Sequence, residues 1–311
     1  MGLKKPGIRS HWHTFNKNKA LFTLSMPALI YIFVMSYLPM VGVVIAFKQY
    51  YDNTGIFGSP WVGLQNFQFF FQGSDAWLVT RNTILYNAAF IVFGIVAAVG
   101  LALIMHQVKG SKLLAAYQTL MLLPYFISWI IVAYIVYGFL SQRYGMLNHV
   151  LPVLGFNHVA FYQSPQFWPY ILIICNLWRN VGFATLVYFA GIMGIDPTYF
   201  EAAIVDGASR WQMARLITIP MISQLIVILF IIAVGGIFNA DFGLFYFVPN
   251  QSVFLTNVTQ VINTYVFNAL MSLGNIGMAA AVGLYQSFVG FVLVLFTNWV
   301  VRRISPDHSL W

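Results

Sequence analysis

Long apolar segments dominate the chain, and short polar segments separate them. About 20 apolar residues in helical form span the hydrocarbon core of a bilayer. Six runs meet that length, at about 21–47, 79–106, 113–140, 168–193, 221–245 and 278–301. The first run is too long for a signal-peptide core and lacks a small-residue cleavage site, so we expect it to be retained. The pattern therefore predicts an all-α polytopic membrane protein with six transmembrane helices.

Composition supports this class of protein. The 311 residues are 60% hydrophobic and 7% charged, which leaves too little polar surface to cover a soluble globule. We expect one transmembrane domain over 21–301, with tails at 1–20 and 302–311. The single cysteine, Cys175, lies in an apolar run and allows no disulfide framework. The histidines form no metal-spaced set with carboxylates, and no nucleophile–base pair is evident, so we expect neither a metal site nor a catalytic site.

Positive charge is concentrated on one side of the predicted topology. The 1–20 tail, the 106–113 turn, the 194–220 loop and the C-terminus hold eleven of the fifteen Lys and Arg residues. Because Lys and Arg are enriched in cytoplasmic loops, we expect both termini and the 194–220 loop to be cytoplasmic. The basic residues lie at the ends of apolar runs rather than on one face. The net charge of +8 therefore indicates a bilayer partner and no nucleic acid.

The opposite connections carry distinctive patterns. Aromatic crowding in 48–78 favours an interfacial helix at headgroup depth. Prolines and a glycine in 141–167 indicate a compact cap. Residues 250–277 predict a helix with an Asn/Gln/Ser/Thr face, too polar to cross lipid comfortably, which we place outside the membrane near a pore mouth.

The most charged segment between two spans is 201–222. Glu201, Asp206, Arg210 and Arg215 fall within fifteen positions of it. Asp196-Pro197 is typical of a helix start, and Pro220 interrupts helical hydrogen bonding. The i,i+4 spacing of Asp206 and Arg210 predicts an ion pair worth roughly 0.2–0.5 kcal/mol on one helix. From the pattern alone, an ordinary loop between spans is equally acceptable.

This segment resembles the EAA loop of ATP-binding-cassette (ABC) importer permeases. That pattern reads EAA, three residues, Gly, nine residues, then I-x-L-P. Glu201-Ala202-Ala203, Gly207, Ile217 and Pro220 match it, with Ile219 in place of Leu. The resemblance implies a type I ABC importer permease fold in which 201–215 is a coupling helix that docks on a cytoplasmic ATPase. It gives coupling roles to Glu201, Ala202, Ala203, Asp206, Gly207 and Arg210.

A polar stripe in the 168–193 run is the first candidate substrate site. Asn176, Arg179, Asn180 and Phe183 lie at i, i+3, i+4 and i+7, hence on one helical face. A charge inside a span costs roughly 2.5–3.5 kcal/mol on insertion scales and usually faces a cavity. A ring beside amides and a guanidinium suits a sugar. The alternative is that Arg179 reaches to the outer headgroups while the asparagines bridge spans.

A second candidate follows Gly235-Gly236, where Asn239 and Asp241 place polar groups near the outer end of the predicted fifth span. The glycine pair loosens the helix. A purely structural helix break with an exposed Asp241 explains the same pattern, and both interpretations remain open.

Further pieces resemble carbohydrate importer permeases of the oligosaccharide class. They include Gly63-Leu64-x-Asn66-Phe67, Leu123-Pro124, Asp241-Phe242-Gly243 and Gly283-Leu284-Tyr285-Gln286-Ser287. The later pieces look most like the branch that imports polysaccharide fragments such as alginate or aldouronate. In maltose-type relatives the span before the EAA loop lines the sugar site, which implies that role for the 176–183 stripe. An acidic substrate would suit Arg179.

The resemblance also implies the partners and the mechanism. We expect a bacterial inner-membrane permease subunit, paired with a second similar permease and served by an external solute-binding protein. The chain has no Gly-x-x-x-x-Gly-Lys motif, so ATP and Mg would be bound by two cytoplasmic partner subunits rather than by this chain. The rival interpretation is a gradient-driven secondary sugar transporter. Such transporters typically use intramembrane carboxylates, whereas all seven Asp and Glu residues lie near or outside predicted span ends.

Overall fold

The protein is all-helical in a computed structural model that describes residues 18–108, 110–272 and 274–304. Residues 1–17, Lys109 and residues 305–311, which were predicted to be cytoplasmic, lie outside these ranges. In the described chain, extended pairing is limited to one isolated bridge between Lys48 and Trp61. The expected fold class is confirmed.

Four of the predicted spans are continuous apolar helices. The first comprises α2 (Lys19–Ile32), a π-helical turn (Phe33–Tyr37) and a 3-10 segment (Leu38–Phe47). The others are α5 (Ser74–His106), α9 (Trp168–Met193) and α17 (Ile276–Ile304). Each is long and apolar enough to cross a bilayer, as the sequence predicted.

The other two predicted spans are bent. In the third, α6 (Ser111–Leu122) and the turn Leu123–Phe126 meet α7 (Trp129–Leu140) at 95°. At the start of the fifth, the helical stretch Arg210–Met221, most of which was predicted to lie in the cytoplasmic 194–220 loop, meets α13 (Ser223–Gly235) at 60°. The described chain thus has four to six spans, depending on whether each bent pair crosses once.

The expected end of the fifth span at 245 is wrong. Helix α13 stops at Gly235, and α14 (Phe242–Phe247) is a separate short helix. The turn between them is held by polar contacts: the Asn239 N–H donates to the Gly236 carbonyl, and the Ala240 N–H donates to the side chain of Asn263. The apolar run continues through both helices, which is why composition alone did not separate them.

Shorter helices fill the connections. They are α3 (Gly55–Gly58), α4 (Gln65–Gln72), α8 (Met146–Val153), α10 (Pro197–Val205), α11 (Arg210–Met213), α15 (Thr256–Thr259) and α16 (Ile262–Met271). The single helix expected over 250–277 is therefore two short ones, preceded by a 3-10 turn at Val253–Leu255. Helix α4 forms where an interfacial helix was expected, but Phe70 turns inward against Tyr265 and Tyr285 and is 1% exposed.

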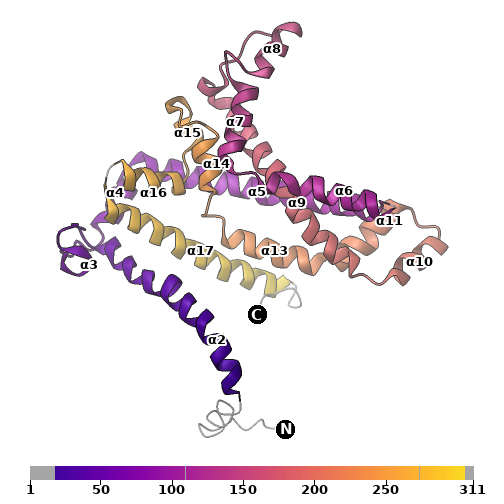
Figure 1. The fold of residues 1–311 in the computed structure, drawn as a ribbon, viewed down its shortest axis with the longest axis horizontal. Helices are drawn as coiled ribbons and strands as arrows, with labels where there is room; N and C mark the ends of the chain where they lie inside the picture. The colour runs from indigo at the N-terminus through magenta and orange to yellow at the C-terminus, as the bar shows by residue number, and fades with distance from the viewer. Residues whose placement is uncertain (1–17, 109, 273, 305–311) are drawn as a thin grey trace.

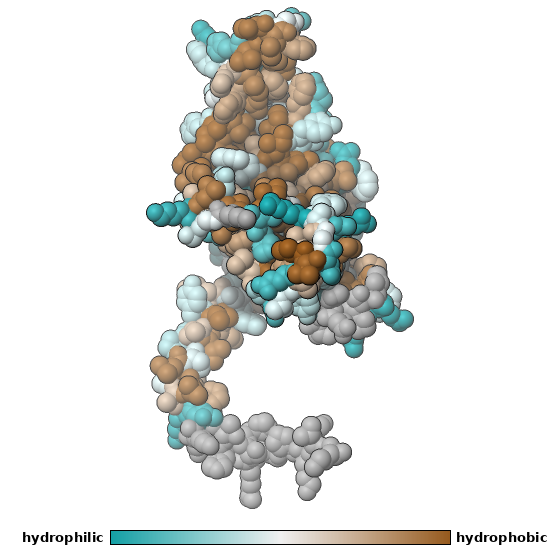
Figure 2. Space-filling view, turned by 90° about the vertical axis from the view of Figure 1, so that its right-hand side faces the viewer, coloured by the Kyte–Doolittle hydropathy of each residue, from teal (hydrophilic) through white to brown (hydrophobic). Residues whose placement is uncertain are grey.

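The helices have a clear spatial order (Figure 1). Helices α10 and α11 lie at one end, whereas α3, α4 and α16 lie at the other. The arm formed by α7 and α8 projects from the bundle, and α2 extends away from it with every residue exposed. Seen from the α10–α11 end, hydrophilic residues gather in front, while the part above is largely hydrophobic (Figure 2).

The centre of the bundle is the packing of α5 against α9, joined by α6. Trp168 and Leu172 of α9 are fully buried. Helix α6 approaches α9 so closely that a Cβ on Gly182 would overlap the carbonyl oxygen of Met121. Small residues allow such close approach between membrane helices.

Replacing Gly182 by alanine should therefore force α6 and α9 apart. We expect a loss of roughly 1–3 kcal/mol, the usual cost of overpacking, seen as a lower unfolding temperature in detergent. Gly100→Ala on α5 is the control, because a Cβ there meets nothing within 4 Å. Equal unfolding temperatures for the two variants would contradict the close approach.

Candidate transport pathway and coupling segment

A cavity of about 340 Å³ lies among the spans. Helix α5 contributes Asn87 and Phe90, α9 contributes Asn176, Asn180 and others, and α13 contributes apolar side chains. The wall is mostly apolar, with a few convergent amides. That combination is typical of small-molecule sites, where apolar contact provides affinity and a few polar groups fix orientation.

The predicted stripe on α9 divides between two environments. Asn176, Asn180 and Phe183 line the cavity, whereas Arg179 is not on its wall. The ring of Phe183 stacks on Tyr125 with centroids 4.9 Å apart, which fixes its orientation. Helical periodicity thus brought three of the four residues to one cavity.

Arg179 lies against the bend between α6 and α7. Its Nε donates a 3.0 Å hydrogen bond to the carbonyl of Ile127, and Nη1 lies 3.4 Å from the side-chain oxygen of Asn180. Its guanidinium carbon lies 4.6 Å from the ring centroid of Trp129. The carbonyl of Ile127 belongs to the non-helical break, so Arg179 supplies the donor that this orphan acceptor needs.

Asp241 is joined to the same bend. Its Oδ2 accepts a 2.7 Å hydrogen bond from the indole Nε1–H of Trp129, and its Oδ1 accepts from the N–H groups of Gly243 and Leu244. Asp241 is thus the N-cap of α14. This geometry favours the structural interpretation of Asp241, although the residue is partly buried rather than exposed as that interpretation assumed.

Asn239 belongs to a separate amide cluster. Its side-chain oxygen accepts from Asn263 at 2.9 Å and lies 3.4 Å from the Gln286 side-chain nitrogen. These residues come from the turn after α13, from α16 and from α17. The cluster holds the outer connection to the last span.

Sequence reasoning missed Asn87 and Trp129. Asn87 lines the cavity and donates to the carbonyls of Thr83 and Ile237. An asparagine well inside a long apolar run was the available signal, because buried amides in spans need partners. Trp129 gave no such signal, since aromatic residues are common throughout the chain.

The coupling segment begins at a well-formed helix cap. The Asp196 carboxylate accepts hydrogen bonds from the N–H and the hydroxyl of Thr198, at 2.9 and 2.8 Å. Those bonds, first the one from the backbone, lower the pKa of Asp196 below its usual value. Pro197 occupies the first helical position, where its missing N–H costs nothing.

The segment 201–215 is not one helix. Helix α10 ends at Val205, Asp206 is its C-cap, and Gly207 has φ +77°, a conformation that favours glycine. Asp206 and Arg210 therefore lie on different helices, and the expected i,i+4 pair is wrong. Arg210 instead places Nη1 3.4 Å from the side-chain oxygen of Gln107 at the end of α5.

The surface of this segment is unusually apolar for a polar loop. Val205 is 87% exposed, and Ile204 and Trp211 are also exposed. Glu201, Ala202, Asp206 and Arg210 are exposed around them, and Ala203 is half-buried. An exposed apolar patch rimmed by polar residues marks a protein-interaction surface.

The Trp129–Asp241 bond should hold the α7 bend to α14. Trp129→Phe keeps the ring but removes the donor, and hydrogen bonds to charged groups contribute roughly 1.5–3 kcal/mol. We expect a lower unfolding temperature for Trp129→Phe. Trp178→Phe is the control, because Trp178 is exposed and makes no such bond. Equal stability of both variants would show that the bond contributes nothing.

Comparisons with known proteins agree with this architecture. Residues 90–306 match the family described as binding-protein-dependent transport system inner membrane component. Protein LplB of Bacillus subtilis is 30% identical over 94% of this chain and 91% of its own. YteP of Bacillus subtilis, a polygalacturonan/rhamnogalacturonan transport system permease protein, is 31% identical over 94% of this chain and 90% of its own.

Solved structures give the same answer. One chain of a bacterial ABC transporter involved in the import of the acidic polysaccharide alginate has a TM-score of 0.85 and 33% identity, covering 94% of this chain and 99% of its own. A structure of bacterial alginate ABC transporter in complex with alginate pentasaccharide-bound periplasmic protein matches equally well, covering 98% of that chain. Since the family match covers more than half of the sequence, the chain belongs to the inner-membrane components of binding-protein-dependent transport systems.

Proposed function

We propose that the chain is one of two permease subunits of an ATP-driven importer for an oligosaccharide. The observation that carries this proposal is the mostly apolar cavity between α5, α9 and α13, which has three asparagines in its wall, and from which α9 leads to an exposed coupling segment. The saccharide class is supported by the similarity to YteP, a polygalacturonan/rhamnogalacturonan transport system permease protein, and to the alginate transporter.

An external binding protein would deliver the sugar to the end of the molecule opposite α10 and α11. Two cytoplasmic ATPase subunits, which bind ATP and Mg, would close and move the coupling segment. The charge distribution of the sequence supports this orientation, with both termini and 194–220 on the cytoplasmic side. The permease pair would then alternate between inward-open and outward-open states.

Asn176, Asn180 and Phe183 would contact the sugar. The ring would lie against C–H groups, and the amides would bond to hydroxyls. Arg179, by contrast, would act by positioning: its Nε is engaged by Ile127, and its guanidinium lies over Trp129. An acidic substrate is therefore weakly supported, because the guanidinium that suggested it is held by other groups.

A gradient-driven transporter is less well supported. Relays for protons or ions use carboxylates within the spans. In the described chain no carboxylate lines the cavity among the spans. Asp241, which lies near the outer end of the predicted fifth span, serves instead as the N-cap of α14.

Asn180→Ala should weaken uptake. Loss of one net hydrogen bond of roughly 0.5–1.5 kcal/mol predicts a roughly three- to tenfold lower uptake efficiency in proteoliposomes. Val187→Ala, which changes the same cavity without removing a polar group, is the control. If Asn180→Ala transports like the parent protein, Asn180 does not contact the cargo.

Gly207→Val should uncouple ATP hydrolysis from uptake. A branched side chain at φ +77° costs roughly 1–2 kcal/mol and shifts the turn between α10 and α11. We expect more ATP hydrolysed per sugar imported by the complete transporter, and the same direction for Glu201→Ala.

Gly155→Val carries the same kind of strain at φ +82° in the outer connection after α8. It should lower stability and leave the ratio of ATP to sugar unchanged. If Gly207→Val and Glu201→Ala also keep the parental ratio, the coupling role is wrong.

A further inference from the structure

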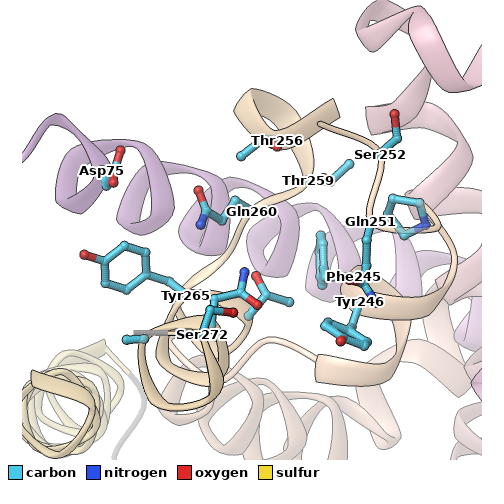
Figure 3. Close-up of a pocket in the computed structure, with 14 residues that line it drawn as sticks. Asp75, Phe245, Tyr246, Gln251, Ser252, Thr256, Thr259, Gln260, Tyr265 and Ser272 are labelled. Carbon is cyan, nitrogen blue, oxygen red and sulfur yellow. The ribbon is translucent and has the colours of Figure 1, made fainter. Parts of the chain in front are cut away.

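A second cavity, of about 470 Å³, lies at the end of the molecule remote from the coupling segment. The start of α5, α14, the connection at 249–252, α15 and α16 enclose it (Figure 3). Its volume is within the range of small-molecule clefts, which runs from about 300 to 1,000 Å³. Within the proposed mechanism this is the end at which cargo arrives.

Three aromatic rings stand in the wall, and neighbours hold each of them. Phe245 is buried edge-on against Tyr86, with centroids 5.0 Å apart. Tyr246 packs on Phe267 at 5.0 Å, and Tyr265 packs on Phe70 at 5.5 Å. These rings are therefore fixed before any ligand arrives, which lowers the entropic cost of binding.

The polar groups of the wall fall into two sets. The hydroxyls of Ser252, Thr256 and Thr259 donate to backbone carbonyls and so support the fold. The side-chain amides of Gln260 and Asn268, and that of Gln251, make no hydrogen bond within the described chain. Each offers one acceptor and two donors to a ligand.

The charge of the wall is negative. Asp75, in the first turn of α5, is exposed, and no Lys, Arg or His of the described chain lines the cavity. Burial raises the pKa of the Tyr265 hydroxyl, and the nearby Asp75 charge raises it further. A ligand carboxylate would be repelled here.

We propose that this cavity is an outer recognition site for a neutral glycosyl unit of the incoming oligosaccharide, and that Asp75 discriminates against uronate units. The partly exposed rings of Tyr246 and Tyr265, which stack on sugar C–H faces, and unpaired amides that bond to hydroxyls provide the affinity. The inference rests on the proposed function, because it names the class of sugar admitted. It separates this chain from the alginate transporter it resembles, whose cargo is acidic.

The test uses the assembled transporter in lipid nanodiscs without binding protein. Saturation-transfer difference NMR is recorded with a mixture of maltotriose, cellotriose and mannotriose, and separately with trigalacturonate. The neutral mixture should give the stronger signal. Gln260→Ala combined with Asn268→Ala should reduce that signal roughly tenfold, as expected for the loss of two hydrogen bonds.

Asp75→Asn should raise the trigalacturonate signal roughly threefold to tenfold at low salt and leave the neutral signal unchanged. The gain should shrink as salt is raised, because screening removes the repulsion that the carboxylate exerts. Asp52→Asn is the matched control, since Asp52 is also exposed on an outer connection but does not line the cavity. It should change neither signal.

Three results would overturn the inference. The parent protein could bind trigalacturonate more strongly than the neutral mixture, the neutral mixture could give no signal, or the neutral signal could be the same in the Gln260→Ala/Asn268→Ala variant as in the parent. Stimulation of ATP hydrolysis by the sugar-loaded binding protein is measured on the same preparation. If stimulation persists, only the outer site is wrong. If stimulation is absent, the proposed function itself fails.

Discussion

A backbone carbonyl that leaves a helix inside a membrane has no water to bond to, so the chain must supply a donor. This constraint accounts for the polar side chains that the apolar segments retain. Arg179 donates to Ile127 at the α6–α7 bend, and Asn87 donates to Ile237 beyond the end of α13. Asn66 donates to the carbonyls of Ala46 and Lys48 where the first span ends. Each break thus depends on one long-range side chain.

The sequence predicted those features that local pattern determines. Four of the six apolar runs appeared as continuous helices because lipid requires both the length and the composition. Asn176, Asn180 and Phe183 fell on one cavity wall because a helix repeats every 3.6 residues. The start of α10 was predicted from Asp196-Pro197, because the Asp196 side chain caps the first turn and Pro197 fits the first helical position.

Features determined by contacts between residues far apart in the chain could not be predicted from the sequence. The 95° bend after Phe126 depends on Arg179 and on the Trp129–Asp241 bond, which join residues 52 and 112 positions apart. The sequence therefore suggested that Arg179 contacts the substrate, whereas its guanidinium is mostly bound by Ile127 and Trp129. The end of α13 at Gly235 was hidden because the apolar residues of α14 continue the run. The Asp206–Arg210 pair failed because Gly207 ends the helix between them.

The isolation of α2 has a consequence for biogenesis. This helix has every residue exposed, yet most of its backbone groups are paired within the helix itself. Helix α2 precedes every described helix of the bundle in the sequence, so translation completes it before them. A segment that needs no neighbour can enter lipid alone and remain stable there while the rest of the chain is translated.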